Sequence, residues 1–375
     1  MGAVWRRWAV SLGLVAGLLA GCHHDSAKRA ATSTTAPGGA PGATTSTAPA
    51  SPTGFLDASF AGDQEGWGLS KEPCPRPGAD QAQCAAVWRT ADGGDAWARL
   101  AHLDVPTDGA AGADFVSAVH VADAAHGWVY GRSLFATFNG GKRWQRVDLG
   151  NPVVALDSLG SQAYALVGSC AVGAGNCTAP MRLFEGTIAT GRWRFVTLGF
   201  DLPPTDAGAV VVSRSAVYAV VTGSGPEQIL LARAANGRWE RRTVPCPRAL
   251  VAAIQSQDGL VAACRPATVD GPTELQTSSD GGRSWAVVWE QNFPSPLVSL
   301  AVTAEAAVVG LQNGAVLRSI DNGMHFSAVL QTGGGPVIRF SDVQHGFITA
   351  GPASGRRLFS TKDGGATWRA LKLPD

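Results

Sequence analysis

Short apolar runs separated by polar turns make up most of the chain, and residues 114–149 show one full set of them. Phe115–Val121 alternates between apolar and polar positions and contains several β-branched residues, as a half-buried strand does. Three further short runs follow at 127–130, 134–137 and 144–149. Four strands so close in sequence predict one antiparallel sheet with hairpin connections.

The same alternation opens the later segments of the chain. Paired runs that fit the first and second strands of a sheet are found at Val153–Leu159 and Ala163–Val167, Ala209–Ser213 and Ala216–Val221, Leu250–Ser256 and Leu260–Ala263, and Leu297–Thr303 and Ala306–Leu311. The first strand of the whole series is predicted at Phe55–Phe60, and the last at Thr367–Leu371.

A polar turn that contains Gly, followed closely by an aromatic residue, recurs seven times. In five copies the Asp or Asn and the aromatic residue are Asp92 and Trp97, Asn139 and Trp144, Asp280 and Trp285, Asp321 and Phe326, and Asp363 and Trp368. Two shorter copies lack the aspartate and end at Trp193 and Trp239. Successive aromatic residues are 41 to 49 residues apart, and such a period indicates repeated supersecondary units.

Seven repeats of four short strands predict an all-β, seven-bladed β-propeller. The propeller is predicted at 54–375, with blades at approximately 55–104, 114–149, 152–200, 208–245, 249–291, 297–331 and 335–373. No strand is left over at either end of this series. We therefore expect the ring to close by packing of the seventh blade against the first, without an exchanged strand.

The repeated phrase resembles the Asp-box, or BNR repeat, of sialidases, sortilins and the photosystem II stability/assembly factor family. The resemblance covers nearly all of residues 55–373, and it implies that each copy is the turn between the third and fourth strands of a blade, at the outer rim. Asp or Asn can accept hydrogen bonds from the backbone of its own turn, Gly supplies a positive φ, and the aromatic residue is expected between sheets. These residues are therefore predicted to be structural.

Sialidase activity would require residues that this chain lacks in the expected places: an arginine triad, a Tyr nucleophile paired with Glu, and an acid–base Asp. No Phe/Tyr-Arg-Ile-Pro phrase precedes Asp92, and Val337–Phe340 is a poor match in the wrong blade. No zinc, nucleophile-elbow or phosphate-loop motif is found, so no catalytic residue, cofactor or metal is predicted. A pair of distant carboxylates acting as a glycosidase stays open.

The N-terminus carries a processing signal at residues 1–21, in which Arg6 and Arg7 precede a short apolar run. The run ends in Leu-Ala-Gly-Cys, which looks like the lipobox of bacterial lipoproteins and implies a lipid on Cys22; the alternative is an ordinary secretory signal. Residues 22–53 are rich in Ala, Thr, Pro, Ser and Gly and are predicted to be a disordered linker. The protein is therefore expected to be exported and anchored to the outer face of the bacterial cytoplasmic membrane or cell envelope.

The net charge bears on the class of partner, and the cysteine content bears on the disulfides. The net charge of +1 gives no basic signal for nucleic acid, and a monomer is expected. Six cysteines remain beyond Cys22, and an even number in an exported protein favours disulfides. Sequence spacing favours the local pairs Cys74–Cys84, Cys170–Cys177 and Cys246–Cys264, one of fifteen connectivities.

Antiparallel strand order places the connections between second and third strands on the same face as the connections between blades. All six cysteines are predicted on this face, where they brace the loops 71–85 and 168–181 and the start of the fifth blade. Seven arginines are predicted beside them as a partner-binding surface: Arg76, Arg132, Arg182, Arg248, Arg265, Arg356 and Arg357. In the alternative interpretation these arginines are scattered and are neutralised by acidic residues on the same face.

The sequence thus predicts a lipid-anchored, extracytoplasmic propeller that acts as a non-catalytic binding or assembly scaffold for an envelope protein. The assembly-factor resemblance implies protein partners, since relatives of similar design bind them. The alternative is a glycan-binding or glycan-cleaving, sialidase-like propeller.

Overall fold

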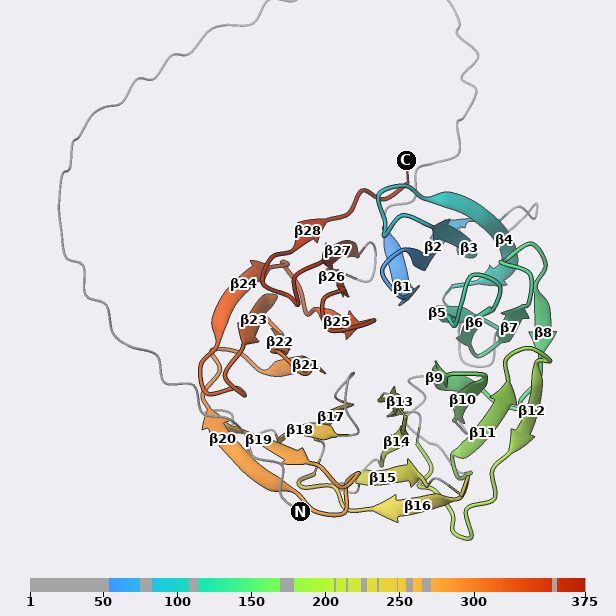
Figure 1. Ribbon diagram of the computed structural model, residues 1–375. Helices are drawn as coiled ribbons and strands as arrows, with labels where there is room; N and C mark the ends of the chain where they lie inside the picture. Colours follow the sequence, from blue (N-terminus) through green and yellow to red (C-terminus); the bar gives the residue numbers. More distant parts are fainter. Residues whose placement is uncertain are drawn as a thin grey trace, which may run out of the picture. The chain divides into compact units, whose positions relative to one another are not determined.

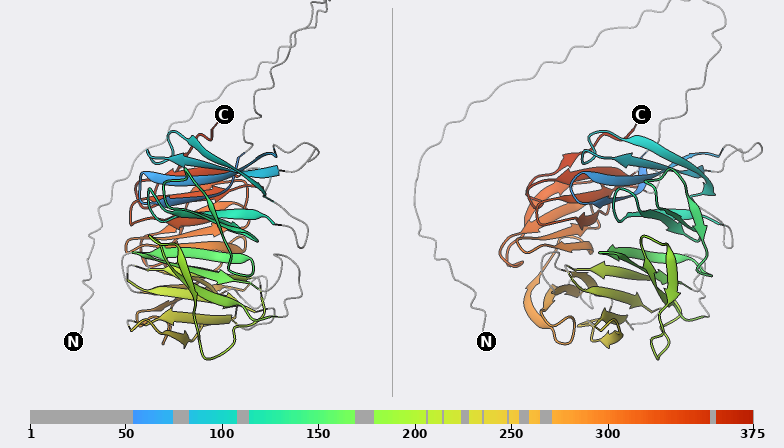
Figure 2. Two further views of the ribbon diagram at one scale, coloured as in Figure 1. Left: turned by 90° about the vertical axis from the view of Figure 1, so that its right-hand side faces the viewer. Right: turned by 45° about the vertical axis from the view of Figure 1, so that its right-hand side comes forward.

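The computed structural model describes residues 54–74, 83–107, 114–168, 179–205, 207–213, 215–223, 228–234, 236–247, 249–253, 259–264, 271–352 and 356–374. These residues form seven four-stranded antiparallel sheets arranged as a ring (Figure 1). In the side views of Figure 2 the strands run between the two faces of the ring. The prediction of a seven-bladed, all-β propeller is confirmed.

Each blade uses four consecutive strands, in sequence order from the channel outward. Blades 1 and 2 contain β1 (Phe55–Ala61), β2 (Glu65–Pro73), β3 (Gln83–Thr90), β4 (Ala98–Pro106), β5 (Val116–Val121), β6 (Gly127–Gly131), β7 (Leu134–Thr137) and β8 (Gln145–Val147). Blades 3 and 4 contain β9 (Val153–Leu159), β10 (Gln162–Val167), β11 (Arg182–Thr187), β12 (Arg192–Phe195), β13 (Ala207–Val212), β14 (Val217–Thr222), β15 (Gln228–Arg233) and β16 (Trp239–Arg242). Blades 5 and 6 contain β17 (Leu250–Ala253), β18 (Leu260–Cys264), β19 (Thr273–Ser278), β20 (Ala286–Gln291), β21 (Leu297–Val302), β22 (Ala307–Leu311), β23 (Ala315–Ser319) and β24 (Ser327–Gln331). Blade 7 contains β25 (Val337–Phe340), β26 (Gly346–Ala350), β27 (Arg357–Thr361) and β28 (Arg369–Ala370).

The predicted strands agree with the observed ones except at some ends. β9 has the predicted bounds, whereas β28 has only two of the five residues predicted for the last strand. The prediction of a long loop at 71–85 is wrong, because β2 runs to Pro73, β3 begins at Gln83, and these two residues pair. The apolar residues of β2 end before Lys71, but the backbone of Lys71 and Glu72 still pairs with β3, so the strand is longer than its apolar run.

The core of the propeller is divided among the interfaces between blades. Seven clusters of buried apolar residues each join two neighbouring sheets. Since both faces of a blade are covered, the second strand of a blade can be buried along its whole length, as in β6 and β26. This explains why such strands read as continuous apolar runs rather than alternating ones.

The aromatic residues of the repeated phrase pack against the preceding blade. The ring centroid of Trp144 in blade 2 lies 5.7 Å from that of Trp67 in blade 1. Trp193 of blade 3 contacts Trp128 of blade 2 at 6.3 Å, and this edge-to-face arrangement is favourable for aromatic pairs. The expectation that these side chains lie between sheets is confirmed for these pairs.

The polar residues of the repeated phrase close the turn between the third and fourth strands. In blade 5, Asp280 Oδ1 accepts hydrogen bonds from the backbone N–H groups of Arg283 at 2.9 Å and Ser284 at 3.0 Å. The Ser278 hydroxyl donates to the same oxygen at 2.8 Å and accepts from the N–H of Gly282 at 2.7 Å. Asn139 accepts from the N–H of Arg143 in blade 2 in the same way.

These turn aspartates are expected to make the fold sensitive to acid. Hydrogen bonds from the Ser284 hydroxyl and N–H hold the pKa of Asp280 well below its ordinary value. A depressed pKa in the folded state stabilises the fold above about pH 4, and this stabilisation is lost as the pH falls below that value. The variant Asp280→Asn should therefore show a smaller drop in melting temperature between pH 5 and pH 2 than the wild-type protein. The reciprocal variant Asn139→Asp should show a larger drop; identical profiles for all three proteins would contradict the assignment.

The ring closes between blades 7 and 1, with both ends of the propeller in separate sheets. The N–H of Arg356 donates to the carbonyl of Phe55 at 3.2 Å, and the rings of Phe60 and Phe347 stack with centroids 3.3 Å apart. Gly94, at φ +95°, is needed at this closure, because a Cβ there would lie 2.4 Å from a methyl group of Leu371. Closure without an exchanged strand is confirmed.

Candidate functional site

The seven innermost strands surround a central cavity of about 700 Å³. Residues of β1, β5, β9, β13, β17, β21 and β25 line it, so every blade contributes to one site. The lining is not uniform around the ring. Most polar side chains come from blades 1, 2, 3 and 7, and the wall supplied by blades 4, 5 and 6 is aliphatic except for Ser213.

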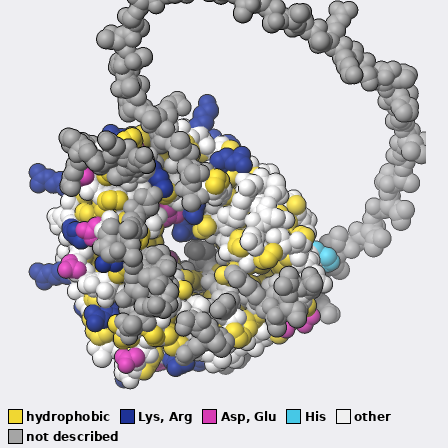
Figure 3. Space-filling view, turned by 180° about the vertical axis from the view of Figure 1, so that it is seen from behind, with side chains coloured by type: hydrophobic (Ala, Val, Ile, Leu, Met, Phe, Trp, Pro, Cys, Tyr) yellow, Lys and Arg dark blue, Asp and Glu magenta, His cyan; other side chains and the backbone are white. Residues whose placement is uncertain are grey.

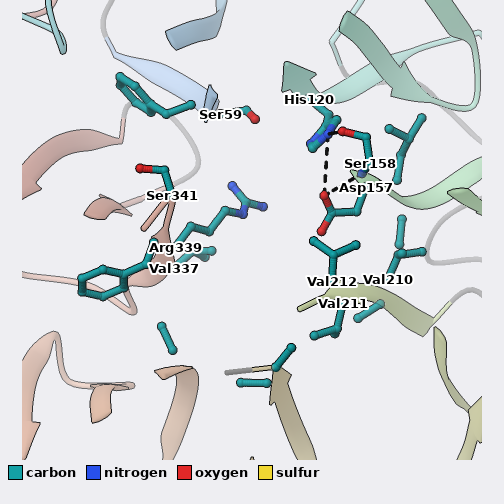
Figure 4. A pocket seen from close by; sticks show the side chains of 18 of the residues that line it. Ser59, His120, Asp157, Ser158, Val210, Val211, Val212, Val337, Arg339 and Ser341 are labelled. Atoms are coloured by element: carbon teal, nitrogen blue, oxygen red, sulfur yellow. Dashed lines mark hydrogen bonds and ion pairs between the residues drawn. The ribbon is translucent and has the colours of Figure 1, made fainter. Parts of the chain in front are cut away.

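Three polar side chains meet on the wall formed by blades 2 and 3 (Figure 4). The Nε2 atom of His120 lies 2.8 Å from the hydroxyl of Ser158 and 3.6 Å from Oδ1 of Asp157. The same carboxylate oxygen accepts a hydrogen bond from the N–H of Ser158 at 2.7 Å. About a quarter of the Asp157 side chain stays exposed to the cavity.

Arg339 reaches into the cavity from β25, on the other side of the channel (Figure 4). Its Nη1 atom donates to Oδ1 of Asp57 and to the carbonyl of Ala58, both at 3.1 Å. The other oxygen of Asp57 accepts from the N–H of Val119 at 3.1 Å. Asp57 is therefore a buried link among blades 7, 1 and 2, and its charge balances that of Arg339.

Burial changes the proton affinities of these groups. It raises the pKa of Asp157 to about 7, against smaller opposing effects of the Ser158 N–H and Arg339. Burial, together with the charge of Arg339, lowers the pKa of His120 to about 3. The pKa of Tyr130, which also lines the cavity, is raised by burial, and that of Arg339 is raised mainly by Asp57. At neutral pH, Asp157 is thus the group in this set whose charge changes.

The geometry of this cluster does not fit a serine hydrolase relay. Ser158 and Asp157 both approach Nε2 of His120, whereas a relay needs the carboxylate on one ring nitrogen and the nucleophile on the other. A pair of glycosidase carboxylates is not assembled here either, because both oxygens of Asp57 are already bonded. Among the described residues that line the cavity, Asp157 is the one carboxylate with an oxygen open to a ligand.

Two of the three predicted disulfides are present in the structure. Cys74, after β2, is bonded to Cys84 in β3, and Cys246, before β17, is bonded to Cys264 at the end of β18. The predicted pair Cys170–Cys177 and the predicted lipidation site Cys22 lie outside the described residues. Both observed disulfides lie at the ends of connections between second and third strands or between blades. Strand order puts these connections on one face of the ring, as predicted from the sequence.

The predicted arginine surface is described only in part. Arg132 follows β6 and Arg182 begins β11, both at connections between second and third strands. Arg356 pairs with Phe55 through its backbone, and Arg357 donates to the carbonyl of Thr332 at 2.8 Å. In the view of Figure 3, the visible Lys and Arg side chains lie mainly on the left and at the top of the ring, with Asp and Glu among them. Three further arginines lie outside the described residues: Arg76, Arg248 and Arg265.

Sequence reasoning missed the channel residues as a group. The sequence pattern places Asp57, His120 and Asp157 in predicted strands, and it places Arg339 in a poor match to the sialidase phrase. A detectable signal was present, since each is a charged or titratable residue inside a short apolar strand at the innermost position of its blade. Their convergence depends on the ring, which joins strands about 280 residues apart in the sequence.

Comparison with solved structures identifies proteins with the same architecture. The structure titled "YCF48 bound to D1 peptide" superposes with a TM-score of 0.55 at 16% sequence identity, covering 87% of this chain and 95% of that one. The chain has the fold of YCF48. YCF48 from Cyanidioschyzon merolae gives a TM-score of 0.53 at 15% identity, covering 84% and 94% of the two chains. A computationally designed protein, Ika8, gives 0.50 at 12% identity, covering 85% and 86%.

The likeness to YCF48 is one of fold, because the identities are low. No family model matches the sequence, and no curated protein matches it. In the part of the chain that the structure describes, no helix is long and apolar enough to cross a membrane.

Proposed function

We propose that the protein is an exported, lipid-anchored scaffold that binds a protein partner through the disulfide-braced face of its propeller. The observation that carries this proposal is the bracing itself. Cys74–Cys84 and Cys246–Cys264 fix the ends of connections on one face of a rigid ring. Connections held on a rigid scaffold are common binding surfaces. The likeness of fold to YCF48 supports the proposal, since YCF48 has been solved bound to a D1 peptide.

The glycan alternative receives less support from the channel. A sugar-cleaving site needs two free carboxylates, and Asp57 is committed to Arg339 and Val119. The wall next to Asp157 is formed by aliphatic residues of β13 such as Val210. The phenyl and phenol rings that line the cavity belong to blades 1, 2 and 7 and not to the strands that hold Asp157 and the valines: Phe60, Tyr130, Phe340 and Phe347.

Partner capture tests the binding proposal. The native protein should be crosslinked in its own envelope, purified by affinity and compared with the variant in which Arg132, Arg182, Arg265 and Arg356 are all replaced by Glu. A partner recognised by this arginine surface should be lost from the variant, because four charges are reversed where the contact forms. Capture of the same partner with unchanged yield would overturn the role of these arginines. A variant with Arg283→Glu, in the turn between β19 and β20 on the opposite face, is the matched control and should retain the partner.

The anchor is tested separately at the predicted lipidation site. Replacing Cys22 with Ser should move the protein from the membrane fraction to the soluble fraction after export, because the acceptor thiol for the lipid is gone. The intact mass of the wild-type protein should exceed that of its polypeptide by the mass of the acyl groups. A wild-type protein without added mass, found in the soluble fraction, would support an ordinary secretory signal instead.

A further inference from the structure

We propose that the central channel is a binding site for a primary ammonium group on an aliphatic stem, with Asp157 as its counter-ion. The ammonium would lie between Asp157 and the hydroxyl of Ser158, and its stem would extend along the aliphatic wall of β13. The source of the group is either a small alkylamine or a lysine side chain of a partner. The site is independent of the disulfide-braced face, so its occupation does not depend on the partner proposed above.

The charges in the channel favour a cation. In the described part of the chain, Asp157 and Arg339 are the charged side chains that line the cavity. Asp57 does not line it but is the partner of Arg339, and His120, which does line it, is neutral. Arg339 and Asp57 balance each other at 3.1 Å. Ionised Asp157 therefore leaves one uncompensated negative charge, and its nearest basic neighbour, His120, is held neutral by burial. An anion would add to this charge, whereas an ammonium group would cancel it.

The shape of the channel favours an aliphatic stem on that cation. β13, the innermost strand of blade 4, follows β9 around the ring (Figure 1), and the two strands hold Asp157 and the valine wall. Three consecutive residues of β13, Val210, Val211 and Val212, line the cavity and are only half-buried (Figure 4). Methylene groups placed against them would remove apolar surface from water on both sides. An ammonium group beside Asp157 with an alkyl stem beside the valines of β13 would therefore complement both parts of the cavity.

Proton linkage gives the site a characteristic pH dependence. The groups that face Asp157 are His120 from β5, Tyr130 from β6 and Arg339 from β25. Arg339 is in turn paired with Asp57 of β1. Of these, His120 and Tyr130 are neutral and Arg339 is charged between pH 6 and pH 8. Only the ionised form of Asp157 pairs with an ammonium group. With a pKa of about 7, the affinity should rise about tenfold from pH 6 to pH 8.

Calorimetric titration of the purified full chain with hexylammonium, hexanoate and hexanol tests the site. Hexylammonium should bind at least about tenfold more tightly than either of the others, and Asp157→Asn should remove this preference. The control Asp114→Asn changes an exposed carboxylate on another surface and should bind as the wild-type protein does. Tighter binding of hexanoate, or an unchanged affinity in Asp157→Asn, would overturn the proposal.

A second measurement, on the wild-type protein, tests the role of Asp157 even if the Asp157→Asn variant does not fold. Titrations at pH 7 in buffers of different ionisation enthalpy should show release of about half a proton per bound hexylammonium, because binding favours ionised Asp157. Binding without proton release would contradict Asp157 as the counter-ion.

A short lysine peptide then distinguishes the two sources of the ammonium group, a small alkylamine and a lysine side chain. Binding of the peptide as tightly as hexylammonium identifies a lysine site, and binding of hexylammonium alone identifies a small-amine site; both support the proposal.

Discussion

Replacing Asp57 with Ala should lower the free energy of unfolding by about 3 kcal/mol. The Asp57 side chain is 8% exposed, and it accepts hydrogen bonds from Arg339 of blade 7 and the N–H of Val119 in blade 2. Its loss leaves a guanidinium without its counter-ion and a buried N–H without an acceptor. Arg339 keeps half of its side-chain surface open to the channel, so the effect falls at the lower end of the range for buried pairs.

Chemical denaturation measures this effect, and Asp114→Ala is its control. Asp114 forms an equivalent pair with Arg146 at 2.9 Å, but these side chains are 48% and 59% exposed. Pairs exposed to this extent contribute less than about 1 kcal/mol. Equal losses in the two variants would show that Asp57 has no special role in closing the ring. If only Asp57→Ala lowers the free energy of unfolding, this carboxylate stabilises the contacts among blades 7, 1 and 2.

Replacing Glu185 with Ala should destabilise the interface between blades 3 and 4 by about 3–5 kcal/mol. The side chain is 2% exposed. One oxygen accepts from Nε of Arg233 at 2.9 Å and from the indole N–H of Trp239 at 2.8 Å, and the other accepts from Arg194. Because Arg233 and Trp239 belong to the next blade, their donors would be left without a partner at a buried interface.

The matched control for Glu185→Ala is Glu240→Ala in the adjacent blade. Glu240 also contacts two arginines, Arg242 and Arg283, but its side chain is 41% exposed. Its removal should cause a smaller fall in the denaturation midpoint, since Glu240 is partly hydrated already and water can replace its contact with the exposed Arg283, although Arg242 is only 10% exposed. If Glu185→Ala unfolds too readily for measurement, Glu185→Gln keeps one acceptor oxygen and should give an intermediate loss. A midpoint for Glu185→Ala equal to that of Glu240→Ala would contradict the role of burial.

The repeated turns were predictable because their interactions are local. The contacts of Asp280 with Ser278, Arg283 and Ser284 span at most four residues, so the sequence alone places the donors beside the acceptor. The same holds for the disulfide Cys74–Cys84, whose residues are ten apart. Short strands with turns at a fixed period then leave few architectures other than a ring of blades.

The channel site was not predictable in the same way, because its residues come from different blades. Arg339 meets Asp57 across 282 residues of sequence, and His120 meets Ser158 across 38. Each of these residues occupies a strand position where an alternating pattern allows a polar side chain. Their shared role appears only when the ring brings the innermost strands together and removes most of the surrounding water.

The sequence by itself determined the number of blades and the turn chemistry, since both follow from short-range hydrogen bonds and from apolar runs that repeat every 41 to 49 residues. It also left no strand over at either end of the series, so that closure needs no exchanged strand. The tertiary structure decided which charges are balanced and which are not. Asp57 and Asp157 are both aspartates of innermost strands, yet only Asp57 lies within reach of Arg339. Burial without a counter-ion raises the pKa of Asp157 to about 7, and that difference between two chemically identical side chains comes from their places around the ring.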